Sequence, residues 1–254
     1  FMIKFGMKKP IYKSLKHFGL DNYKEQKEIL EPSAGNGAFL SYAKNHFDNL
    51  NFTVIEIDKT SKNLLSNLYP NQEIHLKGFE EYKDKKGFDA VIGNPPYGQK
   101  RIFDTNNPDI SMLSVHNYFS ARAIKELKDD GIMAFVTSSY FLDSKDSTLR
   151  DDISKEASFI GAIRLPNDTF KNKAGTEVTT DIIFFKKGFD KELHQDYSKQ
   201  ITTLATVESD KPIIINEYFI NNPQNILGEL QWKLSGIGES VQCIAIDGLN
   251  IVEE

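Results

Sequence analysis

The chain has 254 residues and a net charge of −5, and its hydrophobic (39%) and charged (26%) fractions are close to those of average soluble globular proteins. This composition excludes disordered, collagen-like and disulfide-scaffold proteins, and the single cysteine, Cys243, leaves neither a disulfide within the chain nor a cysteine-rich metal site. Without an apolar run of about 18 residues or a signal-peptide core, we expect a cytoplasmic protein with no membrane contact, and the acidic balance alone argues against a nucleic-acid partner.

The order of the predicted elements along the chain is that of an α/β protein. A short helix is predicted over Ile11–Phe18, where Gly19 stops it. From Glu28 to Lys187, β-rich runs alternate with stretches whose apolar residues recur every three or four positions, a pattern typical of parallel strands joined by crossover helices. The predicted strands are Glu28–Glu31, Phe52–Asp58, Ile74–Phe79, Phe88–Gly93, Gly131–Ser138, Phe159–Leu165 and Val178–Phe185. The predicted helices are Ala38–Phe47, Lys59–Leu68, Val115–Lys128 and Thr148–Ala157.

The last two predicted strands differ from the others in their connection. The stretch between them, Pro166–Glu177, is polar and lacks helical periodicity, so it predicts a hairpin and one antiparallel strand at the sheet edge. We therefore expect an α/β fold with a Rossmann-like, mostly parallel seven-stranded sheet and helices on both faces. Residues 28–187 are predicted as the main domain, 1–27 as an N-terminal helical segment, and 188–254 as a C-terminal extension of unassigned role.

A glycine-rich run joins the first predicted strand to the helix that follows it. Gly35 and Gly37 let a ligand approach the backbone closely and leave N–H groups at the helix start free to bind it. The dinucleotide fingerprint needs a third glycine where this chain has Leu40, which weakens a nicotinamide or flavin interpretation. At the end of the second strand, Glu56 and Asp58 can accept hydrogen bonds from ribose hydroxyls, so a nucleoside-bearing cofactor is favoured.

The fourth predicted strand runs directly into Asn94-Pro95-Pro96-Tyr97. Consecutive prolines fix φ and bias the residues before them toward extended conformations, so a stiff turn is expected here. The turn lies at the carboxyl end of the sheet, where open α/β folds bind their ligands. Because an amide precedes the prolines and an aromatic residue follows them at this edge, we interpret the turn as a functional loop.

Three segments together resemble a known family. Glu31–Gly37, Glu56–Asp58 and Asn94–Tyr97, in this order and spacing, resemble the S-adenosylmethionine-binding and catalytic motifs of DNA adenine-N6 methyltransferases. The resemblance covers roughly residues 29–187 and implies a methyltransferase catalytic domain over 28–187, with S-adenosylmethionine as cofactor and DNA as substrate. The segment from Arg164 to Asp181 also resembles a subgroup in which such a domain is joined to helicase-like segments of a larger restriction-modification polypeptide.

The resemblance assigns roles to individual residues. The implied cofactor-binding residues are Glu31, Pro32, Ala34, Gly35, Gly37, Glu56, Ile57 and Phe79, the last against the cofactor's adenine. The implied catalytic residues are Asn94, Pro95, Pro96 and Tyr97. The implied substrate-binding residues are Tyr97 and Phe170, which would contact the flipped base, together with Lys173. Independently of the resemblance, Lys100 and Arg101 directly follow the catalytic loop and are placed to meet phosphates of the substrate. The histidines show no metal-ligand spacing, so no metal site is predicted.

The expected chemistry explains these residue types. The lone pair of an adenine exocyclic nitrogen is delocalised into the ring, which makes this nitrogen a poor nucleophile. The side-chain carbonyl of Asn94 and the backbone carbonyl of Pro95 would accept its N–H groups and favour a tetrahedral nitrogen with a localised lone pair. Because the nitrogen is inaccessible inside a duplex, the adenine has to be flipped out and stacked, and Tyr97 supplies one aromatic face.

Two positions depart from the commonest family pattern. Gly78 stands where many members carry an aspartate that binds the cofactor's amino group, and Glu80 could substitute for it. Upstream, Pro10 is present without the threonine that usually precedes it. These departures keep open a second hypothesis, a non-catalytic cofactor- or nucleic-acid-binding module of a larger modification protein.

Other classes of methyltransferase need or usually carry different residues at these positions. Cytosine-C5 enzymes are excluded because they need a cysteine nucleophile, whereas Cys243 lies far beyond the predicted sheet. Cytosine-N4 enzymes more often carry serine or aspartate where Asn94 stands, and protein-glutamine enzymes usually open the glycine loop with aspartate. Methyl transfer to RNA adenine or to protein glutamine remains open. Since the chain begins at Phe1 and shows no recognition domain, we expect it to work with further domains or a subunit that recognises the target.

Overall fold

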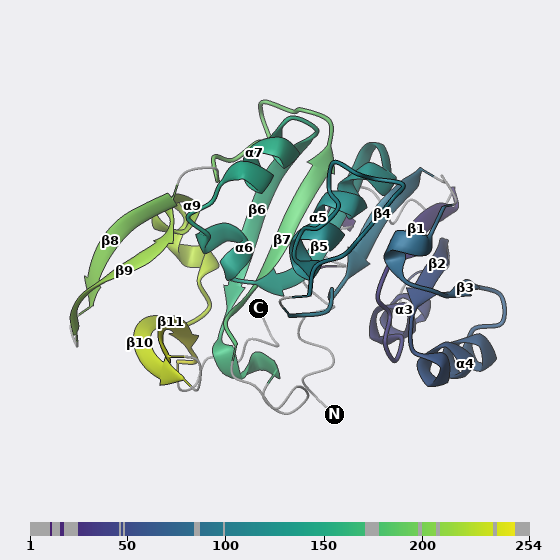
Figure 1. Cartoon of the computed structure of the whole chain (residues 1–254), viewed down its shortest axis with the longest axis horizontal. Coiled ribbons are helices and arrows are strands. Elements are labelled where there is room, and N and C mark those ends of the chain that lie inside the picture. Colours follow the sequence, from purple (N-terminus) through teal and green to yellow (C-terminus); the bar gives the residue numbers. More distant parts are fainter. Residues whose placement is uncertain are drawn as a thin grey trace.

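Seven strands form one central sheet in the order β3-β2-β1-β4-β5-β7-β6 (Figure 1). The computed structural model describes residues 11, 16–17, 25–45, 47, 49–83, 87–98, 100–170, 178–197, 200–206, 209–235 and 238–246. The strands are β1 (Lys27–Glu31), β2 (Leu50–Glu56), β3 (Glu73–Leu76), β4 (Phe88–Gly93), β5 (Leu127–Ser138), β6 (Ala157–Leu165) and β7 (Thr180–Lys187). The predicted fold class, a mostly parallel seven-stranded α/β sheet, is confirmed.

The antiparallel strand of the sheet is β7. It pairs antiparallel with β5 on one side and with β6 on the other, while the remaining neighbours are parallel. The predicted hairpin therefore exists, but its second strand lies one position inside the edge and β6 forms the edge. As a result, the end of β6, the start of β7 and the loop between them reach the edge at which β4 and β5 end.

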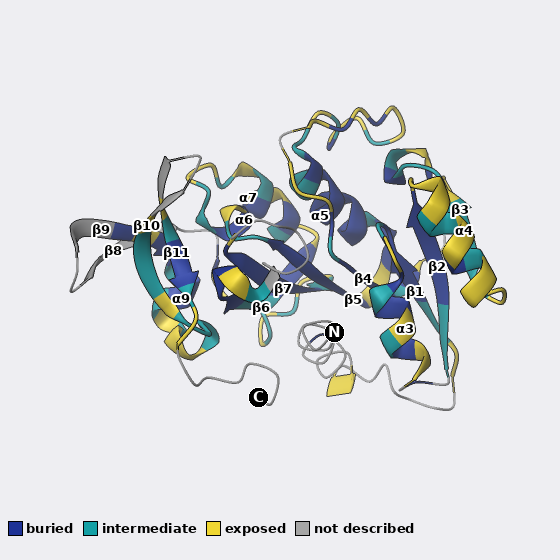
Figure 2. Ribbon diagram, turned by 90° about the horizontal axis from the view of Figure 1, so that it is seen from below, coloured by how far each residue is buried: buried dark blue, intermediate teal, exposed yellow. Residues whose placement is uncertain are grey.

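Helices cover both faces of the sheet (Figure 2). One face packs against α3 (Ala38–Lys44) and α4 (Lys59–Leu68), which contribute Phe39, Leu40 and Leu65 to its core cluster. The other face packs against α5 (Val115–Glu126), α6 (Tyr140–Asp143) and α7 (Thr148–Ser154). Alternate strand residues supply the two clusters, so that in β4 Val91 faces α5 while Ala90 and Ile92 face α3, as expected for central strands buried on both sides.

The third predicted strand is shorter in the structure than in the sequence pattern. It ends at Leu76, and Phe79 instead begins a 3₁₀ turn, η1 (Phe79–Glu81). Gly78 is the N-cap of this turn, and Glu80 and Glu81 lie within the turn. Of the helix predicted over residues 11–18, Ile11, Lys16 and His17 are described and are helical.

The chain after the sheet forms two ribbons and short helical turns. β8 (Gln200–Thr206) pairs with β9 (Ser209–Asn216), and β10 (Glu229–Ser235) pairs with β11 (Gly238–Ile244), with α9 (Glu217–Asn221) and η3 (Pro223–Asn225) between the ribbons. Tyr218 and Phe219 of α9 are buried in the same cluster as α5, which attaches this segment to the main core. No helix among the described residues is both long and apolar enough to cross a bilayer.

Candidate active site

The glycine-rich loop and the proline-containing loop lie next to each other. β1 pairs with β2 on one side and with β4 on the other, so the loops that leave β1 and β4 emerge side by side at the carboxyl edge. Such a reversal of strand order is where open α/β sheets bind ligands. The Ser33 hydroxyl donates to the backbone oxygen of Asn94 at 3.2 Å, which joins the two loops directly.

The glycine-rich loop places its two glycines in left-handed conformations, with φ of 54° at Gly35 and 70° at Gly37. A Cβ at Gly35 would meet nothing within 4 Å, so the backbone here borders open space that a ligand can enter. A Cβ at Gly37 would lie 2.3 Å from the buried Leu65 Cδ2 of α4. One glycine therefore leaves room for a ligand, whereas the other lets two helices approach.

A carboxylate from β2 closes the other side of this loop. The Oε2 of Glu56 accepts the Gly35 N–H at 2.5 Å, and its Oε1 accepts the Asp58 N–H at 2.7 Å. Each carboxylate oxygen has a second lone pair, so Glu56 retains acceptor capacity for a ligand hydroxyl. Glu31 and Pro32 are buried at the end of β1, while the Ile57 side chain is 72% exposed beside the same opening.

Phe79 lies in the core. Its ring contacts those of Tyr118 and Phe119, with centroids 6.2 and 5.2 Å away, and the Arg122 guanidinium lies 5.5 Å from its centroid. Its exposed fraction is 1%, so contact with a cofactor adenine stays a prediction. Next to it, the Glu80 carboxyl carbon lies only 2.6 Å from where a Cβ of Gly78 would be, which places this carboxylate where the side chain of an aspartate at position 78 would lie.

The loop after β4 holds its amide and aromatic groups in contact. The Tyr97 hydroxyl donates to Asn94 Oδ1 at 2.9 Å, and this bond orients the amide oxygen. A phenol ordinarily has a pKa of about 10, so at neutral pH the Tyr97 hydroxyl is protonated and remains a donor. Pro95 is buried, whereas Pro96 and Tyr97 are exposed.

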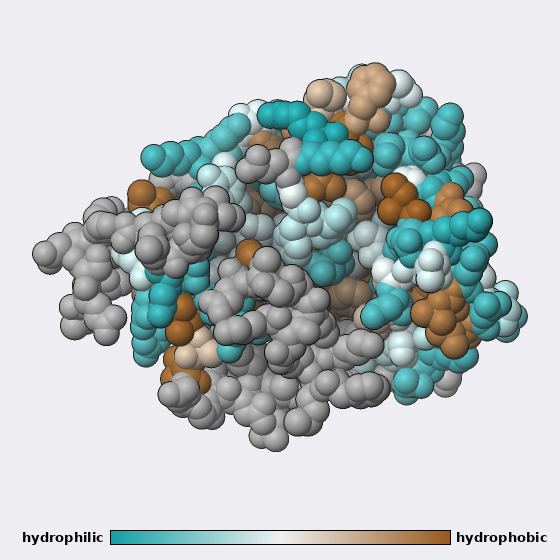
Figure 3. All heavy atoms as spheres, turned by 60° about the horizontal axis from the view of Figure 1, so that its bottom comes forward, coloured by the Kyte–Doolittle hydropathy of each residue, from teal (hydrophilic) through white to brown (hydrophobic). Residues whose placement is uncertain are grey.

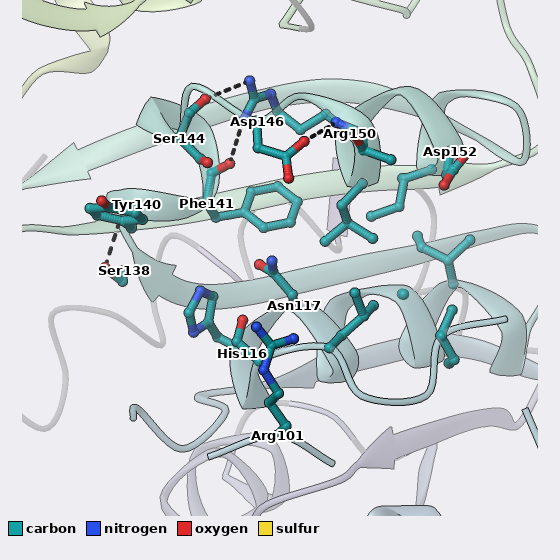
Figure 4. Close-up of a pocket in the computed structure, with 18 of the residues that line it drawn as sticks. Arg101, His116, Asn117, Ser138, Tyr140, Phe141, Ser144, Asp146, Arg150 and Asp152 are labelled. Carbon is teal, nitrogen blue, oxygen red and sulfur yellow. Dashed lines mark hydrogen bonds between the residues drawn. The ribbon is translucent and has the colours of Figure 1, made fainter. Parts of the chain in front are cut away.

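A groove of about 1320 Å³ extends from this loop between α5 and the α6–α7 segment. Figure 4 shows Arg101, His116 and Asn117 on one wall, and Tyr140, Phe141 and Ser144 on the other. Burial lowers the pKa of His116, which favours its neutral form. The second wall is held by Arg150, whose guanidinium donates to the backbone oxygens of Phe141 and Ser144.

The two predicted DNA-contacting cations of the first loop are exposed. Lys100 and Arg101 lie a few residues beyond Tyr97, and Arg101 Nη1 donates to the Met112 backbone oxygen at 2.7 Å.

Figure 3, which brings forward the lower edge of Figure 1, shows a mostly hydrophilic described surface with scattered apolar patches. Within the described ranges, no group of three His, Cys, Asp or Glu residues could hold a metal ion.

The hairpin loop that follows β6 is held at its base. Arg164 of β6 and Asp181 of β7 form a buried bidentate pair at 2.8 and 2.9 Å, and Asp143 lies 2.9 Å from the same guanidinium. Phe170 ends the turn η2 (Asn167–Phe170), but its side chain lies outside the described residues, as does all of Lys173. Their contacts with a substrate remain predictions.

Sequence reasoning missed three residues at this edge. Ser33 lies inside the recognised glycine-rich run, so its position was the available signal. Arg164 and Asp181 are charged residues within otherwise apolar predicted strands, and such an interruption indicates a buried pair at a strand end.

Cys243 lies closer to this edge than its sequence position suggests. Its backbone N–H donates to Thr179 Oγ1 at 2.9 Å, just before β7. Its side chain is buried, and burial raises the pKa of the thiol to about 12. A protonated, inaccessible thiol is no nucleophile, so burial excludes Cys243 from this role although it lies near this edge of the sheet.

Comparisons with known proteins agree with this geometry. The profile of the Eco57I restriction-modification methylase family matches residues 11–170. Defense against restriction protein B of Escherichia phage P1 is 30% identical over 165 residues, which are 62% of this chain and 7% of the phage protein. Type II methyltransferase M.CvrRI of Paramecium bursaria Chlorella virus XZ-6E is 27% identical over 170 residues, 64% of this chain and 43% of the viral protein. This chain therefore spans less than half the length of either curated relative.

A solved structure shares the fold. A protein of Listeria monocytogenes, assigned to the class I S-adenosylmethionine-dependent methyltransferases, superposes with a TM-score of 0.56 at 17% identity. The match covers 71% of this chain and 59% of the Listeria chain.

Proposed function

Because this chain belongs to the Eco57I restriction-modification methylase family, we propose that it transfers a methyl group from S-adenosylmethionine to the exocyclic N6 of a flipped-out adenine in DNA. Two predictions from the sequence are confirmed at the coarser level, a methyltransferase of restriction-modification type and S-adenosylmethionine as its cofactor. The observation that carries the finer proposal is the Ser33–Asn94 hydrogen bond, which joins the proposed cofactor loop to the proposed catalytic loop.

The residues around Gly35 fit the proposed cofactor. The open space at Gly35 admits the ligand close to the backbone, and Glu56, with unused lone pairs beside it, would accept the ribose hydroxyls. Ile57 would supply an apolar surface, and Glu80 would bind the adenine amino group in place of an aspartate at position 78. The cofactor supplies an electrophilic methyl group on a sulfonium.

The chain's own part in the reaction is to hold and polarise the target nitrogen. Asn94 Oδ1, oriented by the Tyr97 hydroxyl, and the Pro95 backbone oxygen would accept its two N–H groups. This localises the lone pair on nitrogen and stabilises the positive charge that develops during transfer. The Tyr97 ring would stack on the base, and Phe170 would contact it from the hairpin loop.

The DNA contacts proposed outside the base pocket are electrostatic. Lys100 and Arg101 lie exposed beside Tyr97, and Lys173 follows Phe170, so each can meet a phosphate of the target strand. Because the chain spans only part of its relatives, we propose that further domains or a subunit recognise the target sequence. We also propose that the protein acts in the cytoplasm, where DNA is accessible.

The test is methyl transfer from labelled S-adenosylmethionine to mixed-sequence DNA, RNA and protein at low salt, followed by digestion and chromatography. Label is expected in N6-methyladenine from DNA. Asn94→Ala should abolish transfer and leave calorimetric binding of S-adenosylhomocysteine within about twofold, whereas Asn117→Ala, which removes an amide from the groove wall, should preserve transfer.

If the label is found elsewhere, or not at all, the acceptor identifies one of the competing functions. Label confined to cytosine, RNA or glutamine would contradict the substrate proposed here. Cofactor binding without transfer to any acceptor would favour a non-catalytic module.

A further inference from the structure

Residues 100–114, which we term the post-catalytic loop, lie between the proposed catalytic residue Tyr97 and the start of α5. The loop closes on itself through backbone bonds from Ile102 to Leu113 (3.1 Å) and from Met112 to Ile102 (2.6 Å). The N–H of Val115, the first residue of α5, donates to the Lys100 oxygen at 2.9 Å. The loop thus begins and ends at the same place, directly beyond the proposed catalytic residues.

Asp104 fixes this loop to α5. Its carboxylate is 1% exposed, and Oδ1 accepts the backbone N–H groups of Asn106 and Asn107 at 2.7 and 3.1 Å. Oδ2 accepts the Tyr118 hydroxyl at 2.6 Å, Arg122 Nη1 at 3.1 Å and the Asn107 amide at 2.8 Å. A buried carboxylate is tolerated only when it is paired and hydrogen-bonded, so these partners hold their arrangement together.

Tyr118 and Arg122 of α5, which bond Asp104, also contact the turn that follows β3. Arg122 Nη2 donates to the Tyr82 oxygen at 2.9 Å, and its guanidinium lies over the Phe79 ring. Arg122 Nε donates to Glu126 Oε1 at 2.7 Å, which fixes the remaining side of the guanidinium. The Tyr118 ring meets the Phe79 ring edge to face. Arg122 and Tyr118 therefore contact the loop through Asp104 and the turn through Phe79 and Tyr82.

We propose that Asp104, Tyr118 and Arg122 are positioning residues that couple the turn Phe79–Tyr82 to the post-catalytic loop, so that cofactor and DNA bind cooperatively. The inference rests on the proposed function, in which the turn holds the cofactor's adenine through Glu80 and the loop continues from the residues that hold the target base. Order imposed on the turn by one ligand is transmitted to the loop through Arg122, because its guanidinium bonds both the Tyr82 oxygen and the Asp104 carboxylate. By linkage, DNA then strengthens cofactor binding by the same factor.

The matched test uses two buried tyrosines of one core cluster. Tyr118→Phe removes the shortest hydrogen bond to Asp104 and keeps the ring. Tyr197→Phe removes a hydroxyl that donates to the Arg150 oxygen at 2.9 Å and accepts from Ser154, in the part of the same cluster where the Tyr197 ring stacks on Phe159. Both variants lose one buried hydroxyl, so a purely structural role predicts similar effects.

Hydrogen exchange of the cofactor-free chain measures the coupling itself. Tyr118→Phe should speed exchange in both Phe79–Tyr82 and residues 100–107, whereas Tyr197→Phe should leave both at the wild-type rate. In ligand binding, Tyr118→Phe should reduce the factor by which S-adenosylhomocysteine tightens DNA binding toward one, from a wild-type factor on the order of 5–150. Arg122→Lys, which keeps the charge but lacks the planar fork, should reproduce both effects.

Each result has a distinct meaning. Unchanged exchange in Tyr118→Phe, or equal changes in Tyr197→Phe, would overturn the coupling. Wild-type protein that binds neither ligand would overturn the proposed function, and the exchange comparison would still decide whether the two segments move together.

Discussion

At the scale of single residues, the hydroxyl of Tyr97 and its ring have separable tasks. The hydroxyl orients Asn94 Oδ1 at 2.9 Å, while the residue as a whole is 45% exposed, which leaves the ring available for stacking. One side chain thus contributes both to the polarity of the base pocket and to its shape.

Substitutions at Tyr97 should separate these tasks. Tyr97→Phe keeps the ring and loses one neutral hydrogen bond, worth about 0.5–1.5 kcal/mol, so kcat should fall roughly 3- to 10-fold with KM for DNA unchanged. Tyr97→Ala also loses stacking, worth about 1–3 kcal/mol per base, and should raise KM for DNA. Steady-state kinetics with varied DNA concentration measures both. Equal effects of the two substitutions would show that the ring has no separate role.

Glu80 gives a second prediction at this scale, because its carboxylate lies where an aspartate at position 78 would place its own. Glu80→Ala removes a charged acceptor, so the Kd for S-adenosylhomocysteine should rise about 10- to 100-fold, corresponding to about 1.5–3 kcal/mol. Adding Gly78→Asp to this variant should restore much of the affinity, whereas Gly78→Asp alone should displace the Glu80 carboxylate from its present position. Calorimetry of the three variants, with Glu81→Ala as control, provides the check. Wild-type affinity in Glu80→Ala would contradict this role.

Some site residues could be recognised from the sequence because their chemistry is local. The segments around Gly35, Glu56 and Asn94 each follow a strand, and strand ends of a parallel sheet meet at one edge. The Asp104 network could not be predicted, since it joins residues from the post-catalytic loop, α5 and the turn after β3, and only the folded chain brings them together.

At the scale of elements, the predicted helices and strands of the sheet domain have the type and order that the structure shows, whereas several of their ends differ by a few residues. Val115–Lys128 was expected to be helical, but the helix ends at Glu126 because Leu127 already pairs with Phe88 as part of β5. The insertion of β7 between β5 and β6 depends on pairing between strands distant in sequence, which periodicity does not report. The two C-terminal ribbons were not predicted, since their strands lack strong alternation.

The approach of α3 to α4 depends on Gly37. Gly37→Ala forces a Cβ to within 2.3 Å of Leu65 Cδ2 and keeps a positive φ, so it should destabilise the fold by about 1–3 kcal/mol. Gly35→Ala meets open space and should cost only the backbone strain, about 1 kcal/mol. Urea unfolding monitored by circular dichroism compares them. A smaller loss for Gly37→Ala than for Gly35→Ala would refute this account of the contact.

At the scale of the whole molecule, the net charge of −5 is compatible with the proposed DNA partner. The exposed cations proposed to meet phosphate flank the base pocket, so local potential and average charge can differ in sign. The C-terminal segment is also part of the folded unit. Asn167 Nδ2 donates a hydrogen bond to Gln242 Oε1 at 2.6 Å, and the Cys243 backbone N–H donates one to Thr179 Oγ1.

Cys243 reports whether this segment stays docked. Burial raises its pKa to about 12, so at pH 8 the native thiol is protonated and inaccessible, and its reaction with a disulfide reagent should be slower than that of the unfolded chain by at least about 100-fold. The rate should rise in Gln242→Leu, which removes the bond to Asn167, and stay low in Gln231→Leu, which changes a half-buried residue of the neighbouring ribbon strand. Absorbance of the released thiolate gives the rates. Fast native labelling would show that the segment is not docked.

The position of β7 also affects how the chain is made. β5 and β6 both leave the ribosome before β7, which must then enter between them, so β5 keeps one open edge throughout the synthesis of the hairpin loop. An unpaired, apolar strand edge is a site for pairing with other chains. Translation through the hairpin is therefore the interval in which the nascent chain most needs protection from aggregation, and slow codons in that stretch would lengthen it.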